Sequence, residues 1–159
     1  MKTLVLGLGN PILTDDGVGI HVLRAVAACC PRSDVAFAEA SVGGIRLLQV
    51  LDGYEQVILV DAIQTRGGRP GAIYRLGVTD LRASLHAGCA HDASLPAALA
   101  LGRRLGMALP SDDAISIIAI EAEEVLTFGE SCTPAVAEAI PRAVEEVLAL
   151  LPGAVQHQE

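Results

Sequence analysis

The chain has 159 residues, which suits one domain whose core is large enough to need no disulfide or metal support. It is 52% hydrophobic but only 3% aromatic, so we expect an aliphatic core of the kind that buried parallel strands and covering helices build. The net charge of −8 argues against nucleic-acid and anionic-membrane partners, because both need a clustered basic face.

Strand and helix patterns alternate along the first half of the chain. Residues 3–8 form a continuous apolar run that ends at glycines and predicts a buried strand. Residues 17–30 carry apolar side chains at helical spacing, and residues 35–40 predict a second strand. Residues 45–51 predict a helix, and residues 56–62 (QVILVDA) predict the clearest strand because they are apolar and β-branched.

The second half continues the alternation. Residues 71–76 predict a strand near an edge of the sheet, and 95–107 an Ala/Leu-rich helix. Residues 114–120 (AISIIAI) predict a central strand, and 134–151 a long closing helix. Because strands alternate with helices, we predict an α/β fold: a three-layer sandwich with a mostly parallel, twisted sheet of about five strands and helices on both faces. Strand order and the direction of the edge strand stay open.

Residues 1–151 are expected to form a single α/β domain, and 152–159 a flexible polar C-terminal tail. The apolar start superficially resembles a signal peptide, but it breaks at Gly7 and Gly9 and offers no small-residue cleavage site. No apolar stretch reaches the ~18 residues of a membrane span. Four cysteines lack CxxC spacing and are expected to be reduced thiols of a cytoplasmic protein: Cys29, Cys30, Cys89 and Cys132.

Polar residues that follow the predicted strands mark the candidate site. Ligands of open parallel sheets bind beyond the carboxyl ends of the strands, at a switch point in strand order. Asp16 lies in the connection after the first strand, and Asp61 comes after the QVILV run. His91 opens the helix that follows the edge strand, and Glu121 ends AISIIAI. Two carboxylates and an imidazole from three separate connections are therefore expected to share one rim.

The glycines and aspartates of the first connection also have simpler interpretations. Gly7 and Gly9 could begin a dinucleotide fingerprint, but Ile12 stands where its third glycine is needed, which favours a tight strand-to-helix turn. Asp15 and Asp16 open a helix, where a carboxylate accepts backbone N–H bonds. We assign the helix cap to Asp15 and an outward ligand role to Asp16.

Asp61 and His91 stand out for different reasons. A carboxylate directly after a buried Val-Ile-Leu-Val run is costly unless it is paired, solvated or ligating, although it could also cap the next turn. A lone histidine is more often a satisfied surface or core residue, and we interpret His86 in that way. The two aspartates are what favour His91 as a site residue.

An Asp/Asp/His set offers two oxygens and one nitrogen, which suits a divalent ion such as Ni²⁺ or Zn²⁺ and leaves coordination positions open. With three protein ligands the site would bind metal weakly, or share a metal that a substrate brings. Alternatively, the same groups could carry out general acid–base hydrolysis without a metal.

A long motif connects these residues to a known family. Residues 6–19 (LGLGNPILTDDGVG) closely resemble the GxGNxLxxD(D/E)GxG signature of the [NiFe]-hydrogenase maturation endopeptidases. The likeness continues at residues 60–62 (VDA), 91–95 (HDASL) and 118–121 (IAIE), and ends at Thr133-Pro134. It therefore covers nearly the whole chain.

The resemblance implies an endopeptidase that removes the C-terminal extension of a hydrogenase large-subunit precursor in the cytoplasm after nickel insertion. It implies that Asp16, Asp61 and His91 form the catalytic site and contact the Ni²⁺ already installed in the precursor. The resting protein would then be metal-free or carry another divalent cation. The family usually has a Gly-Thr pair ahead of a glycine after the second strand, where this chain has residues 41–44 (SVGG). If that loop contacts the substrate tail, Val42 removes a hydroxyl donor and alters substrate choice.

Two rival functions remain open. A non-catalytic nickel-binding hydrogenase-assembly chaperone would use the same metal site but would not cleave its partner. A small-molecule hydrolase or nucleotide-binding domain is disfavoured, because the third glycine and a Gly-x-Ser-x-Gly elbow are both missing. The sequence leaves open which hydrogenase is served, where it is cleaved and how the protein oligomerises.

Overall fold

A computed structural model describes residues 1–83 and 95–154. Five strands form one sheet in the order β2-β1-β3-β5-β4. The strands are β1 (Thr3–Leu8), β2 (Val35–Ala40), β3 (Gln56–Ile63), β4 (Ile73–Gly77) and β5 (Ile115–Glu121). The helices are α1 (Val18–Cys29), α2 (Ile45–Leu51), α3 (Val78–Ala83), α4 (Leu95–Arg104) and α5 (Pro134–Leu150), with short 3₁₀ turns η1 (Thr14–Gly17) and η2 (Asp112–Ala114).

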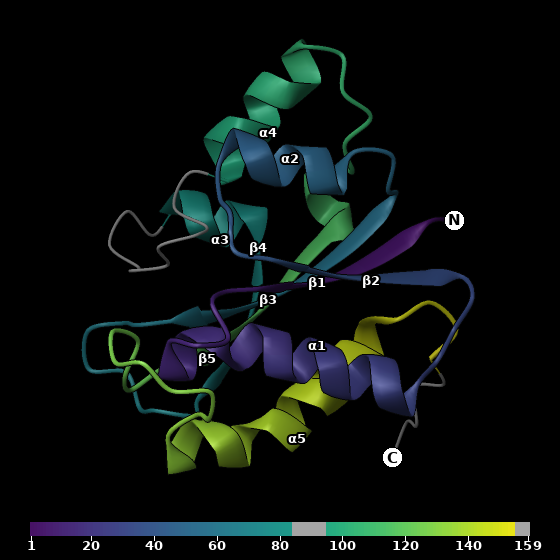
Figure 1. Cartoon of the computed structure of the whole chain (residues 1–159). Helices are drawn as coiled ribbons and strands as arrows, with labels where there is room; N and C mark the ends of the chain where they lie inside the picture. Colours follow the sequence, from purple (N-terminus) through teal and green to yellow (C-terminus); the bar gives the residue numbers. More distant parts are fainter. Residues whose placement is uncertain (84–94, 155–159) are drawn as a thin grey trace.

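The sheet lies between two layers of helices (Figure 1). Helices α1 and α5 cover one face, where Val22 and Val147 pack with Val60 of β3. Helices α2, α3 and α4 cover the other face, where Leu48 and Leu99 pack with the opposite side chains of the same strands. The predicted three-layer α/β sandwich with a five-stranded sheet is confirmed.

The sheet is parallel except for β4, which pairs antiparallel with β5 at the edge. The short connection of residues 64–72 explains this direction, because a parallel return to the same sheet needs a crossover of a dozen or more residues. The edge position predicted for residues 71–76 is confirmed.

One helix was not predicted, and another ends three residues earlier than predicted. Helix α3 was not predicted, because a segment of six residues is too short to show a helical period. The carboxylate of Asp80, in its first turn, accepts a hydrogen bond from the backbone N–H of Gly77 at 2.6 Å. Helix α4 ends at Arg104 rather than at residue 107. Gly106 adopts a left-handed φ of +83°, and the N–H of Met107 turns back to the carbonyl of Gly102, which is a common way for a helix to end.

Two glycines let α1 pack unusually close to the sheet. A Cβ at Gly19 would lie 2.2 Å from the carbonyl oxygen of Val60 and 2.6 Å from that of Leu8. A Cβ at Gly7 of β1 would lie 2.7 Å from the carbonyl oxygen of Gly19. Part of the glycine pattern in residues 6–19 is thus required by helix–sheet contact, as expected for a tight strand-to-helix connection.

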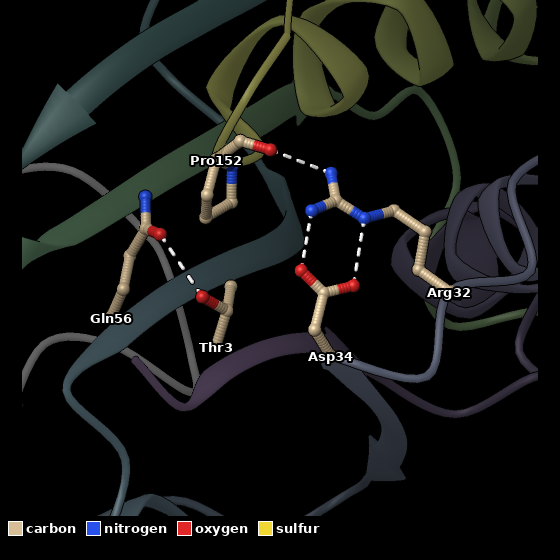
Figure 2. A network of polar contacts seen from close by, with 5 residues as sticks. All are labelled: Thr3, Arg32, Asp34, Gln56 and Pro152. Atoms are coloured by element: carbon tan, nitrogen blue, oxygen red, sulfur yellow. Dashed lines mark hydrogen bonds and ion pairs between the residues drawn. The ribbon is translucent and has the colours of Figure 1, made fainter.

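A polar network joins the amino ends of the strands to the end of α5 (Figure 2). Arg32 donates two hydrogen bonds to the carboxylate of Asp34, and these lower the pKa of that carboxyl below its ordinary value. Arg32 Nη1 also donates to the carbonyl of Pro152 at 2.7 Å, and Thr3 Oγ1 donates to Gln56 Oε1 at 3.2 Å. Pro152, the first residue of the predicted tail, is therefore hydrogen-bonded to the domain. Residues 155–159 lie outside the described part of the chain.

The described cysteines, Cys29, Cys30 and Cys132, are free thiols, as predicted, and Cys89 lies outside the described residues. Within residues 1–83 and 95–154, no helix is long and apolar enough to cross a membrane.

Candidate active site

The strand order creates a switch point between β1 and β3. The chain leaves β1 through α1 on one face and reaches β3 through α2 on the other, so the connections at the carboxyl ends of β1 and β3 diverge. Such a divergence leaves a crevice in which open α/β sheets bind ligands. Asp16 lies in η1 directly after β1, Asp61 lies near the carboxyl end of β3, and η1 contacts β3. The structure thus brings together the segments that carry the two aspartates.

Asp16 is half-buried and held by the turn that precedes it. Its Oδ2 accepts a hydrogen bond from the backbone N–H of Asn10 at 2.9 Å, and Asn10 Oδ1 accepts one from Ile12 N at 3.1 Å. Gly9 has a φ of +131°, and a Cβ there would lie 1.9 Å from the carbonyl oxygen of Asp16. The Gly9-Asn10-Pro11 turn therefore fixes the position of Asp16, and no described residue donates a hydrogen bond to its Oδ1.

Asp61 is fully buried and lies inside β3, opposite Ala119 of β5. Its side chain shares a face with Leu59 and Ile63, so it points toward the α2–α4 layer. Oδ1 accepts a hydrogen bond from the N–H of Ala62 at 2.8 Å. A carboxylate at 0% exposure is costly unless it has partners or a ligand, and the site role of Asp61 stays a prediction.

His91, the third predicted site residue, lies outside the described residues, as does His86. Across residues 1–83 and 95–154, no group of three or more His, Cys, Asp or Glu side chains is placed to hold a metal ion. The complete Asp16–Asp61–His91 set stays a prediction. Its two carboxylates supply oxygen ligands that suit a divalent ion.

The helix-cap role predicted for Asp15 is wrong. No side-chain hydrogen bond caps η1 or α1. Instead, the fully buried Asp15 carboxylate accepts four hydrogen bonds from the β5–α5 loop: from the N–H groups of Glu123 (2.9 Å), Glu124 (3.0 Å) and Thr133 (2.7 Å), and from the Thr133 hydroxyl (2.8 Å). Asp15 organises a distant loop, a role that local capping rules do not reveal.

Glu121 has an anchoring role that the sequence did not indicate. It is 2% exposed, and its Oε1 accepts bonds from both the N–H and the hydroxyl of Thr65 at 2.8 Å. A Cβ at Gly68 would lie 1.6 Å from the same oxygen, so the β3–β4 loop passes directly over the carboxyl. The turn-rich segment that carries Thr65 and Gly68 predicts a loop after β3 but does not indicate its contact with Glu121.

The β5–α5 loop itself contains two perturbed groups. The N–H groups of Leu126 (2.7 Å) and Thr127 (3.0 Å) donate to Glu124 Oε1 and lower the pKa of that carboxyl. Burial, with a smaller contribution from the charge of Asp15, raises the pKa of the Cys132 thiol to about 11. Cys132 is therefore mostly a protonated thiol at neutral pH, which is typical of an unreactive structural cysteine.

A groove of about 270 Å³ runs beside the turn that holds Asp16, at the carboxyl ends of β1 and β2. Asn10 and Pro11 line one side, and Glu39 and Ser41 line the other. It offers a place for a few residues of an extended chain next to Asp16.

Comparisons with known proteins identify the family of this chain. Residues 20–150 match the family model HycI, hydrogenase maturation protease. The chain is 31% identical over 74 residues to the hydrogenase 2 maturation protease of Escherichia coli (strain K12), which covers 46% of this chain and 45% of that protein. It is 27% identical over 150 residues to the hydrogenase expression/formation protein HupD of Rhodobacter capsulatus, covering 92% of this chain and 70% of that protein.

The fold also matches a solved structure. The hydrogenase maturating endopeptidase HYBD from E. coli superposes with a TM-score of 0.77 at 27% identity, covering 94% of this chain and 91% of that one. The sequence match to the family model extends over most of the chain, from α1 to the end of α5. The chain belongs to the hydrogenase maturation protease family, a family of peptidases.

Proposed function

We propose that this protein is a cytoplasmic endopeptidase that removes the C-terminal extension of a [NiFe]-hydrogenase large-subunit precursor after nickel insertion. Asp16, Asp61 and His91 recognise the nickel that the precursor carries. The reaction is hydrolysis: the peptide C–N bond breaks, and water supplies the oxygen of the new carboxylate and the proton of the new amine.

The observation that carries this proposal is the position of Asp16 and Asp61. The 3₁₀ turn η1, which contains Asp16, contacts the strand β3, which contains the buried Asp61. This contact lies at the switch point of a fold that matches the E. coli endopeptidase across 94% of this chain. Asp61 lies inside a strand, which fixes its backbone, and the Asp16 carboxylate accepts a hydrogen bond from Asn10, so both residues are held before a cation arrives. The pair is suited to a ligand that is itself positively charged.

In this proposal the nickel of the precursor supplies the positive charge that the two carboxylates recognise. Asp61 contributes a carboxylate withdrawn from water, where its attraction to a cation is little screened. Asp16 is only half-buried, and Asn10, which donates to its carboxylate, lines the groove that we propose for the incoming chain. A precursor without nickel would present no charge to this pair, so it would not be held for cleavage.

Variants test the residue roles. Asp16→Ala and Asp61→Ala are expected to abolish tail release from nickel-loaded precursor, measured by mass spectrometry. The matched control is Asp113→Ala, which should keep full activity. It removes an exposed carboxylate of η2, which precedes β5 and so lies at the amino ends of the strands, away from the predicted site. Full activity in both site variants would refute the assignment. A stable complex with an unshortened precursor would instead identify the protein as a non-catalytic nickel-binding assembly chaperone.

A further inference from the structure

Two loops beside the site expose large apolar side chains. Ile12 follows the turn that holds Asp16 and is 46% exposed. Leu126 and Phe128 of the β5–α5 loop are 84% and 80% exposed, more than any other large apolar side chain of the described residues. We call these three residues the apolar patch. Exposed apolar clusters with polar borders are typical of interaction sites.

The two loops form one surface because their backbones are hydrogen-bonded to each other. The N–H of Thr14 donates to the carbonyl of Gly129, and the N–H of Gly129 donates to the carbonyl of Ile12, both at 2.9 Å. Leu13 and Gly129 pair as an isolated parallel β-bridge. The N–H of Asp15 donates to the carbonyl of Glu124 at 2.9 Å. The apolar patch is thus joined to the segment that ends in Asp16.

The exposure of Leu126 and Phe128 follows from a defined loop conformation. The Glu124 carboxylate accepts the N–H groups of Leu126 and Thr127, and the buried Asp15 carboxylate fixes the loop on either side of them. A loop organised by two carboxylates presents these side chains to water, at a cost in free energy that grows with their exposed apolar area. Covering them with a partner recovers that free energy.

The groove beside Asp16 is too small to bind a folded protein by itself. Its volume of about 270 Å³ accommodates a few side chains. A specific protein–protein contact buries roughly 800 Å² on each partner. A peptidase that acts on a folded precursor therefore needs a second contact surface near the groove, and the apolar patch adjoins the same turn.

From this arrangement we infer that the apolar patch docks the folded body of the large-subunit precursor while its tail enters the site. The exposed carboxylates of Glu123 and Glu130 border the patch, so the complementary surface is an apolar area edged by Lys or Arg side chains. This inference rests on the proposed function and adds a specificity surface to it. Phe128 and Leu126 are the expected anchors, because they are the most exposed large apolar side chains of the described residues and have the most apolar area to bury.

The test is binding of nickel-loaded large-subunit precursor from the same organism to the variant Leu126→Ala/Phe128→Ala. The dissociation constant and the KM for tail release should both rise roughly ten- to hundredfold, while kcat and the unfolding temperature stay unchanged. The matched control is Leu105→Ala, which removes a side chain that is 72% exposed just beyond α4 and should bind like the wild type.

Four other outcomes are informative. Equal binding by the double variant and the wild type would overturn the inference, as would a wild-type protein that binds no precursor. Concentration-dependent dimerisation that the double variant loses would assign the patch to a second copy of the chain and also overturn it. Binding that depends on the patch, without tail release by the wild type, would refute the proposed function and leave the docking surface confirmed.

Discussion

Asp15 and Asp16 are adjacent carboxylates with different roles. Asp15 is fully buried and accepts four hydrogen bonds from the β5–α5 loop, whereas Asp16 is half-buried and accepts one from Asn10. The first residue therefore stabilises the loop, and the second is available to a ligand. The sequence placed one of the pair in the site but could not show what the other bonds, because its partners lie more than 100 positions away.

This division of roles predicts losses of stability of different size when each aspartate is replaced. Asp15→Ala should lower the free energy of unfolding by about 2–4 kcal/mol, because it leaves buried N–H groups without an acceptor. Asp16→Ala should lower it by less than ~1 kcal/mol, since one partly exposed hydrogen bond is lost. Urea unfolding measures both values. Equal losses of stability in the two variants would contradict the assignment.

At the scale of elements, the contact between α1 and the sheet depends on Gly19. Alanine at this position would place its Cβ 2.2 Å from the Val60 carbonyl oxygen, so the helix must shift. We expect Gly19→Ala to cost about 1–3 kcal/mol of stability, as overpacking usually does. Gly77→Ala is the control, because a Cβ there meets nothing closer than 3.6 Å. Thermal unfolding that is unchanged by Gly19→Ala would show that α1 does not pack as described.

The β5–α5 loop should loosen in acid through Glu124. Its folded-state pKa lies below the ordinary value of 4.5, so its contribution to loop stability is complete above that pH and is lost as the pH falls through the folded-state value. Hydrogen-exchange protection of the Leu126 and Thr127 amides should decrease over that range. In Glu124→Gln, protection should not vary with pH there. A pH dependence that persists in this variant would assign the effect to another group.

Most elements could be predicted because their signals are local. The apolar runs of β1, β2 and β3 and the helical period of α5 determine their own boundaries to within a residue. The antiparallel direction of β4 and the role of Glu121 depend on contacts across the sheet, which no local pattern encodes. The proximity of the segments that carry Asp16 and Asp61 was predictable, because strand topology alone brings the ends of β1 and β3 together.

At the scale of the whole molecule, the two ends of the strands have different roles. The polar network around Arg32 and Asp34 ties the amino ends of the strands to the end of α5, while the carboxyl ends carry Asp16, Asp61, the groove and the apolar patch. The network at the amino ends stabilises the fold, whereas the connections at the carboxyl ends carry the predicted site residues and the exposed apolar side chains. Ligand binding is therefore expected at the carboxyl ends of the strands.

The most direct measurement compares nickel-loaded and nickel-free precursor, each incubated with the wild-type protein and weighed by mass spectrometry. A site in which two carboxylates and an imidazole hold the substrate's cation should shorten the nickel-loaded chain and leave the nickel-free chain intact. Equal shortening of both chains would show that the nickel is not what the site recognises. No shortening of either chain would show that this protein is not the processing peptidase.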